Sequence, residues 1–227
     1  MHLPISDKIE LNILHQNSHQ AEKNKIKFNN YNLLCLNIMS SPGAGKTRLL
    51  EITLEDLSKK FHSAVLEGDM TTNLDAARLE KLNIPVVPIT TGRACHLDAN
   101  MVSGGLKLLE KKINPDSLDI LLVENVGNLV CPAEFEIGEH FKVALLSITE
   151  GEDKPLKYPI MFREADLILI TKVDLLPHLN FDINELKSNI ASTNPKADVI
   201  EISSITKSGF DLWQDWISKK ILKFKNN

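Results

Sequence analysis

Short apolar runs alternate with longer amphipathic stretches along most of the chain. Seven apolar runs of strand length occupy 33–39, 64–67, 86–89, 120–124, 143–148, 167–171 and 199–202. Helix-like periodicity falls between them at 46–60, 74–82, 98–112, 183–192 and 208–223. Continuous apolar runs are typical of parallel strands covered on both faces, and their alternation with helices implies right-handed βαβ units. We therefore predict an α/β fold with an open, mostly parallel sheet of about seven strands flanked by helices.

The first 31 residues follow a different pattern. They are mostly polar, and Ile5, Ile9, Ile13 and Leu14 recur at roughly helical spacing, which predicts a helical arm. The rest of the chain contains no internal repeat and no low-complexity linker. We therefore predict an N-terminal helical arm at 1–31 and a single domain at 32–227.

Composition narrows the class of protein. The chain is 43% apolar and 25% charged, as in globular proteins, and its net charge of −4 argues against nucleic-acid binding. No apolar run approaches the ~20 residues that span a bilayer, and no signal peptide is evident. Three cysteines are too few, and odd in number, for a disulfide framework. We therefore expect a cytoplasmic protein without membrane attachment, in which cysteine near histidine indicates metal binding or catalysis.

A glycine-rich turn, SSPGAGKT, follows the first apolar run and precedes an amphipathic helix. Backbone N–H groups in such a loop, together with the helix N-terminus, cradle phosphate. Lys46 is expected to reach the β- and γ-phosphates, and Thr47 to hold Mg²⁺. Ser40 stands where the strict P-loop pattern has glycine, but Gly43 and Gly45 remain where the backbone must turn. The predicted phosphate-binding residues are Gly43, Ala44, Gly45, Lys46, Thr47 and Arg48.

Carboxylates follow two other apolar runs. Glu124 ends a buried strand, which suits the Walker-B role of holding Mg²⁺ directly or through a water, although most GTPases have Asp there. Gly127 is expected to offer its backbone N–H to the γ-phosphate. Asp69 and Asp75 follow the second run, and each is a candidate to meet Mg²⁺ or to position the attacking water. The expected catalytic residues are thus Lys46, Asp69, Asp75 and Glu124, and the expected magnesium site is Thr47, Asp69, Asp75 and Glu124.

The tetrapeptide TKVD follows the sixth apolar run and indicates specificity for guanine. Guanine presents its N1–H and N2–H₂ donors side by side, and a carboxylate such as Asp174 accepts both. The stem of Lys172 can pack along the base, while Thr171 stands where the common GTPase form has Asn. Ser203 and Ser204 come after the last run, where GTPases close over the guanine. We therefore predict GTP and GDP as the nucleotides.

Thiolate and imidazole groups suggest a transition-metal site. Cys95 and His96 are adjacent after the third apolar run, and Cys131 lies four residues beyond Gly127. These ligand types suit Zn²⁺ and Ni²⁺, and a fourth ligand would be water or a group from a second subunit. If Gly127 moves when the γ-phosphate leaves, Cys131 moves with it. On the residues alone, a buried hydrophobic role for Cys131 is an equal alternative; Cys35 is expected to be core, and His140 a surface residue.

Six motifs occur in one order: SSPGAGKT, GD…LDAARLE, TGRACHLDA, ENVGNLVCP, ITEGEDKPLKYP and TKVDLLP. Together they resemble HypB, the hydrogenase maturation GTPase family, from about residue 32 onward. The resemblance implies a P-loop GTPase of the class that dimerises through its nucleotide face. It also implies a metal site at the dimer interface built from Cys95, His96 and Cys131. Lys154, in the fifth motif, is a candidate for contact with nucleotide or with a partner subunit, a solvated lysine being the equal alternative.

The N-terminal segment departs from many relatives, which carry a cysteine motif or a histidine-rich tract there. It has no cysteine and only His2, His15 and His19. We therefore predict neither a high-affinity N-terminal nickel site nor a storage role. Nickel, with zinc in competition, is expected at the site in the GTPase domain, because affinity alone does not select the metal.

The motifs together predict a metallochaperone that hydrolyses GTP and couples nucleotide state to binding and release of nickel or zinc during [NiFe]-hydrogenase maturation. Its expected partners are a second copy of the chain and a nickel-binding accessory protein. Slow turnover is expected because no clear arginine finger is evident, Arg93 being a weak candidate. The alternatives are a urease accessory GTPase resembling UreG, a metal-binding module with a structural nucleotide site, and a generic ATPase. UreG has a compact Cys-Pro-His motif, whereas Ala133 follows Cys131-Pro132 here.

Overall fold

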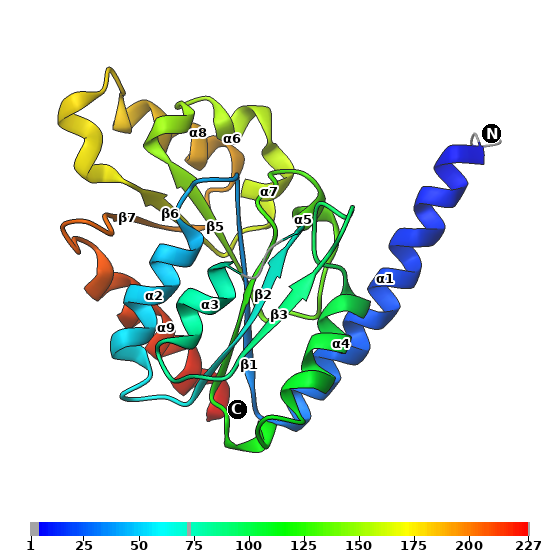
Figure 1. The fold of residues 1–227 in the computed structure, drawn as a ribbon. Coiled ribbons are helices and arrows are strands. Elements are labelled where there is room, and N and C mark those ends of the chain that lie inside the picture. The colour runs from blue at the N-terminus through cyan, green and yellow to red at the C-terminus, as the bar shows by residue number, and fades with distance from the viewer. Residues whose placement is uncertain (1–4, 72–73, 227) are drawn as a thin grey trace.

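A seven-stranded parallel sheet forms the centre of the protein (Figure 1). This computed structural model describes residues 5–71 and 74–226. Every pair of neighbouring strands is parallel, in the order β3-β2-β4-β1-β5-β6-β7. The predicted parallel α/β sheet is thus confirmed. The strands are β1 (Leu34–Ser40), β2 (Ser63–Asp69), β3 (Val86–Thr90), β4 (Ile120–Glu124), β5 (Phe141–Ser147), β6 (Leu167–Thr171) and β7 (Asp198–Ile202).

Helices connect the strands, as right-handed crossovers between parallel strands require. The α-helices are α1 (Ile5–Asn30), α2 (Lys46–Leu57), α3 (Leu74–Glu80), α4 (Ala99–Leu109), α5 (Cys131–Glu134), α6 (Lys154–Lys157), α7 (Pro159–Glu164), α8 (Ile183–Thr193) and α9 (Phe210–Lys225). Three 3₁₀ turns complete the described elements: η1 (Pro115–Ser117), η2 (Ile148–Glu150) and η3 (Val173–His178). In the described part of the chain, no helix has both the length and the apolar composition needed to cross a bilayer.

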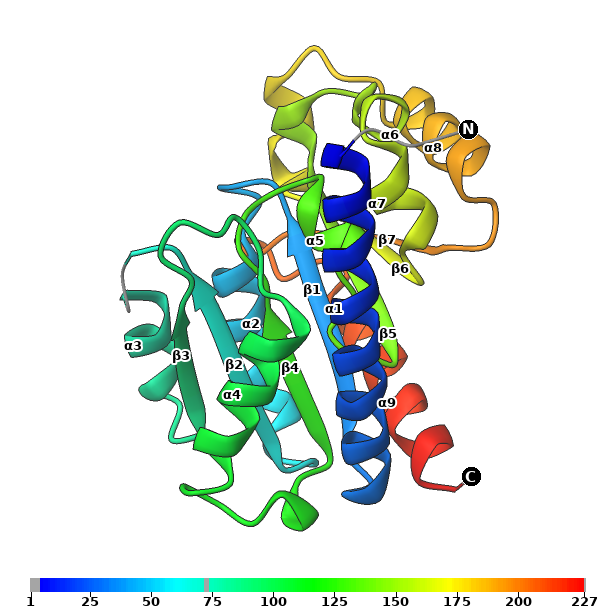
Figure 2. The ribbon, with the colours of Figure 1, turned by 90° about the vertical axis from the view of Figure 1, so that its right-hand side faces the viewer.

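Both faces of the sheet are covered, which explains why the strands are apolar on both sides. On one face, α2, α3 and α9 pack over the sheet around the fully buried Trp213. On the other face, α1 and α4 cover one half of the sheet, and α5, α7 and α8 cover the other half. Figure 2 shows α1 and α4 side by side in front of the sheet, with α2 and α9 behind it.

The N-terminal helix α1 packs along the sheet through its second half. Its buried seam consists of Asn17, Ala21, Asn24 and Phe28, at the i, i+4, i+7 and i+11 spacing of one helix face. Ile13, one of the residues whose spacing suggested this helix, is half exposed. The amino-terminal turns of α1 stand away from the rest of the domain (Figure 1). The predicted arm at 1–31 includes residues 1–4, which lie outside the described residues.

The topology brings the chemically active loops to one edge. Strand β1 lies between β4 and β5, so the chain leaves it at a point where the strand order changes direction. Ligands of open α/β sheets bind at such switch points, beyond the carboxyl ends of the strands. The loops after β1, β2, β3, β4 and β6 all open at this edge, and they carry nearly all of the predicted site residues.

Candidate nucleotide and metal site

The loop between β1 and α2 has the backbone geometry of a phosphate cradle. Gly43 and Gly45 have φ of 78° and 101°, left-handed values that favour glycine. The buried Lys46 donates from Nζ to Ser40 Oγ at 2.9 Å, so the serine that departs from the P-loop pattern accepts a hydrogen bond from the lysine. Burial lowers the pKa of Lys46, against the opposing effect of nearby carboxylates led by Glu124. An anionic ligand would relieve this burial cost.

A cavity of about 450 Å³ opens above this loop. It brings together most of the predicted phosphate and magnesium residues. Its wall includes Gly43, Gly45, Lys46, Thr47, Arg48, Asp69, Asp75, Glu124 and Gly127. It also includes Glu67, Arg78 and Asn125, for which no role is predicted from the sequence.

Thr47 and Glu124 meet at the base of the cavity. The Thr47 hydroxyl donates to Glu124 Oε1 at 2.7 Å, while Glu124 Oε2 is buried and has no hydrogen-bond partner among the described residues. Burial raises the pKa of Glu124 to about 7, although Lys46 and Thr47 act in the opposite direction. A buried carboxylate with an unsatisfied oxygen beside a threonine hydroxyl fits Mg²⁺, which prefers oxygen ligands.

Glu67 is a second buried carboxylate in the same place. It lies in register with Glu124 on the neighbouring strand and is 2% exposed, with Oε2 lacking a partner in the described structure. Burial, and then the proximity of Glu124, raises the pKa of Glu67 to about 8. No role for Glu67 is predicted from the sequence, although it ends an apolar run as Glu124 does. The available signal was this shared position at the end of an apolar run within a buried strand.

Of the two remaining carboxylates of the cavity wall, Asp75 belongs to an ion-pair network. Asp69 Oδ1 accepts from the backbone of Met70 at 2.7 Å. Asp75 accepts from Arg78 Nη1 at 2.9 Å, and Arg78 also makes two 2.9 Å bonds to Glu51. Arg48 donates to the same Glu51 at 3.0 Å. Both arginines in the cavity wall are therefore engaged by Glu51.

The predicted guanine residues lie on the other side of the phosphate loop. Thr171 Oγ1 donates to Ala44 O at 2.8 Å, which joins the end of β6 to this loop. Lys172 has the left-handed φ of 62°, which is uncommon for a non-glycine residue and clusters at functional sites. Ser203 Oγ donates to Asp174 Oδ1 at 2.5 Å and holds this carboxylate in place. Ser204 follows directly, in the loop after β7.

Lys154, like the predicted guanine residues, lies outside the cavity wall. It begins α6, and its Nζ lies 5.1 Å from the centre of the Tyr158 ring. Arg93, the weak candidate for an arginine finger, is exposed in the turn that follows β3 and is likewise absent from the wall.

The three predicted transition-metal ligands meet within a single chain. Three potential ligand atoms, one each from Cys95, His96 and Cys131, lie within 4.8 Å of one another. The two sulfur atoms are 3.1 Å apart, and Cys95 Sγ lies 3.9 Å from His96 Nδ1. Burial lowers the pKa of His96, which favours the neutral, metal-binding imidazole. Burial and the neighbouring Cys95 raise the pKa of Cys131, so a metal would displace a thiol proton there.

The other cysteine and the extra histidine candidate lie elsewhere. Cys35 is fully buried in β1, and its backbone N–H donates to His140 Nδ1 at 2.9 Å. His140 Nε2 lies 2.9 Å from Asn29 Oδ1, so the neutral ring donates there. The predicted core role of Cys35 agrees with its burial.

A hydrogen bond between Leu97 and Asn125 joins the loop that carries Cys95 and His96 to the nucleotide cavity. Asn125, directly after Glu124, is fully buried, and its Oδ1 accepts from Leu97 N at 2.9 Å. The Leu97 side chain packs so closely on Gly68 that a Cβ there would lie 2.6 Å from it. A Cβ on Gly127 would lie 2.9 Å from the backbone of Pro42 in the phosphate loop. We call segment 95–99 the Cys95–His96 arm and segment 127–137 the Cys131 arm of the metal site. Each arm thus contacts the nucleotide cavity.

Comparison with known proteins agrees with this geometry. Residues 34–201 match the family described as CobW/HypB/UreG, nucleotide-binding domain. The chain is 48% identical to the hydrogenase maturation factor HypB of Azotobacter vinelandii, over 94% of this chain and 69% of that protein. The crystal structure of HypB from Helicobacter pylori in complex with nickel superposes with a TM-score of 0.87 at 39% identity, covering 92% of this chain and 96% of that one.

The crystal structure of HypB from Archaeoglobus fulgidus gives a TM-score of 0.84 at 37% identity, covering 91% of this chain and 99% of that one. This likeness extends over nearly the whole of both chains. The chain therefore belongs to the HypB hydrogenase maturation factors of the CobW/HypB/UreG nucleotide-binding family.

Proposed function

We propose that this protein hydrolyses GTP and uses its nucleotide state to bind and release nickel, with zinc as a competitor, during [NiFe]-hydrogenase maturation. In this proposal Lys46 and the phosphate loop bind the nucleotide. Thr47 and Glu124, with Asp69 or Asp75 nearby, hold Mg²⁺. Cys95, His96 and Cys131 bind the transition metal. The nickel complex of the Helicobacter pylori relative supports nickel as the cargo.

Guanine is the proposed base because Asp174 is already oriented by Ser203. A carboxylate fixed in this way can accept both donors of guanine, whereas adenine presents no such pair of donors. Lys172 would lie along the base, with Thr171 and Ser204 beside it. Lys154, at the start of α6, is proposed to contact the nucleotide or a second subunit.

One observation carries the coupling: both arms of the metal site contact elements that would touch the nucleotide. Cys131 lies four residues after Gly127, which packs on Pro42 of the phosphate loop. Leu97, in the Cys95–His96 arm, donates a hydrogen bond to Asn125. A change at the γ-phosphate that moves either contact would alter the spacing of the ligands. Metal affinity depends strongly on how the ligands are spaced and oriented.

Slow hydrolysis and nucleotide-dependent dimerisation are part of the proposal. The arginines of the cavity wall, Arg48 and Arg78, are both engaged by Glu51, so neither is free to act as an arginine finger. Met70, Leu74 and Val130 expose apolar side chains near the two sites, which suits a face that pairs with a second copy. The account also includes a cytoplasmic location and a nickel-binding accessory protein as partner.

Native mass and metal content, measured with GDP and with a non-hydrolysable GTP analogue, test this function. The expected result is a dimer with the GTP analogue and a nickel content that changes with nucleotide. Phosphate release from GTP should be slow and should be abolished in Lys46→Ala. Asp174→Asn should weaken GTP binding without improving ATP competition. Identical mass and nickel content in both nucleotide states would contradict the proposal.

A further inference from the structure

Two buried asparagines of α1 each contact both arms of the metal site. Asn17 Oδ1 accepts from Ala99 N at 2.9 Å, and Asn17 Nδ2 donates to Glu136 O at 2.8 Å. Asn24 Nδ2 donates to Ala99 O at 2.7 Å and to Ile137 O at 3.0 Å. The exposed fractions of the two asparagines are 5% and 2%. Each side chain therefore bridges one segment near residue 99 and one near residue 136.

These two segments are the ones that carry the ligands. Ala99 comes three residues after His96 and begins α4, whose N-cap Asp98 accepts from Met101 N at 2.7 Å. Glu136 comes just after α5, which begins at Cys131. Between them, the ring of Phe135 lies 4.1 Å from the ring of His96, measured between centroids. The hydrogen bond from Asn17 to Glu136 O therefore fixes the residue next to Phe135, whose ring packs on His96.

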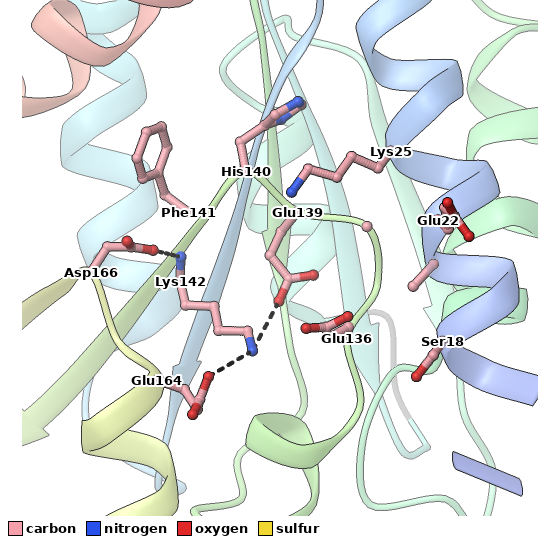
Figure 3. Close-up of a pocket in the computed structure, with 12 residues that line it drawn as sticks. Ser18, Glu22, Lys25, Glu136, Glu139, His140, Phe141, Lys142, Glu164 and Asp166 are labelled. Carbon is pink, nitrogen blue, oxygen red and sulfur yellow. Dashed lines mark hydrogen bonds and ion pairs between the residues drawn. The ribbon is translucent and has the colours of Figure 1, made fainter. Parts of the chain in front are cut away.

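The close approach of the second segment to α1 is built into the backbone. Gly138 has φ of 96°, and a Cβ there would lie 2.6 Å from Ala21 O and 2.7 Å from Asn24 Cβ. Gln20 Nε2 donates to Asn24 Oδ1 at 2.9 Å and thereby orients the Asn24 amide. Figure 3 shows Glu136 and Glu139 on the segment that passes beside α1, from which Ser18, Glu22 and Lys25 project.

A cavity of about 340 Å³ lies next to this contact. Its buried Lys142 sits between Glu139 and Glu164, at 3.8 Å and 3.9 Å (Figure 3). Glu139 also accepts from Asn37 and from Ile137 N, at 3.3 Å and 2.8 Å. Glu139 and Lys142 therefore have their partners within the protein, and their contacts help to hold the segment that passes beside α1.

We propose that α1 is a clamp for the metal site, in which Asn17 and Asn24 hold the Cys95–His96 arm and the Cys131 arm at metal-binding spacing. This inference rests on the proposed metal site and adds a positioning role for a helix that lies outside the matched nucleotide-binding domain, which starts at residue 34. Groups that orient metal ligands typically change metal affinity by about 10- to 100-fold when they are removed. The two asparagines are positioning residues and do not touch the metal.

The test compares nickel affinity in Asn24→Ala and in Asn29→Ala, with GDP bound in both. Asn29 contacts His140 at 2.9 Å and neither metal arm, so its variant removes a polar contact of α1 that is unrelated to the site. The expected result is an affinity for nickel at least about tenfold weaker in Asn24→Ala, with altered nickel–thiolate absorption, and unchanged affinity in Asn29→Ala. GDP affinity should be unchanged in both variants, which also reports that they fold.

A second variant guards against a folding defect. Asn17→Asp keeps the shape of the side chain and the acceptor for Ala99 N, but it loses the donor to Glu136 O. It should therefore weaken nickel binding and alter the same absorption band. Nickel affinity equal to that of the unchanged chain in both Asn24→Ala and Asn17→Asp would overturn the clamp and leave the proposed function intact. Failure of the unchanged chain to bind nickel would instead overturn the metal site and the clamp with it.

Discussion

At the scale of single residues, two carboxylates at the base of the cavity form part of the proposed cation site. Glu67 and Glu124 lie side by side in register, are almost fully buried, and each has one oxygen without a partner in the described structure. Two adjacent buried carboxylates repel each other when both are ionised. A divalent cation between or near them would remove that repulsion. The cation-free pair is therefore expected to hold a proton near neutral pH.

A pH-dependent response to magnesium follows from these carboxylates. Their pKa values, about 8 for Glu67 and about 7 for Glu124, mean that protons compete with Mg²⁺ below pH 8. The Mg²⁺-dependent gain in GDP affinity should therefore increase from pH 6 to about pH 8 and then level off. In Glu67→Gln the upper part of this rise should disappear. Titration of GDP with and without Mg²⁺ measures it, and a gain that is flat across this range would refute the role of the pair.

His140 gives a prediction about stability. Burial, and then Lys25, lowers the pKa of His140 to about 4, below the usual value of 6.5. A depressed histidine pKa stabilises the fold above pH 6.5, and this contribution is lost as the pH falls toward 4. The loss amounts to at most about 3 kcal/mol. Chemical denaturation should show the unfolding free energy of His140→Gln approaching that of the unchanged chain at low pH. A constant difference from pH 4 to pH 7.5 would contradict this.

At the scale of elements, the apolar pattern was sufficient to predict the seven strands. The runs at 120–124 and 167–171 coincide with β4 and β6, and the other strands differ by a few residues at their ends. The pattern missed α5, α6 and α7, which have four, four and six residues. Such short helices, each with proline near its start, do not complete enough turns to show a 3.6-residue period.

The packing of α1 was also beyond sequence reasoning. The side chains that suggested a helix include Ile13, which is exposed, whereas the buried seam contains the polar Asn17 and Asn24. Buried asparagine is stable only when its hydrogen bonds are made, and apart from Gln20 the partners here are backbone groups distant in the chain. The family resemblance predicted Cys95, His96 and Cys131 as ligands, but it gave no sign of the asparagines that contact their segments. Asn125 was missed for the same reason.

The contact between the phosphate loop and the loop after β4 yields an element-scale prediction. Gly127→Ala would drive a Cβ to 2.9 Å from Pro42, and such overpacking costs about 1–3 kcal/mol. GTP-analogue affinity should therefore fall by at least about fivefold. The matched control is Gly104→Ala, since that glycine of α4 has open space around its Cβ position. Equal analogue affinity in the two variants would show that the close contact does not matter for binding.

At the scale of the whole molecule, two sites share one edge of the sheet. The nucleotide cavity lies between the loops after β1, β2 and β4, and the proposed metal ligands lie on the loops after β3 and β4. The loop after β4 therefore belongs to both sites, and Asn125 in this loop is bonded to the other metal arm at Leu97. Coupling between two ligands is reciprocal, so nickel should change nucleotide affinity by the same factor as nucleotide changes nickel affinity.

Nickel titration of one preparation, loaded with GDP or with a non-hydrolysable GTP analogue, is the sharpest test of coupling between the two sites. The account predicts that the two dissociation constants differ by about tenfold, within the usual range of allosteric coupling. In Asn125→Ala the ratio should fall toward one while nickel still binds, because the bond to Leu97 is lost and the ligands remain. Equal nickel affinity in the two nucleotide states of the unchanged chain would contradict the coupling of hydrolysis to metal release.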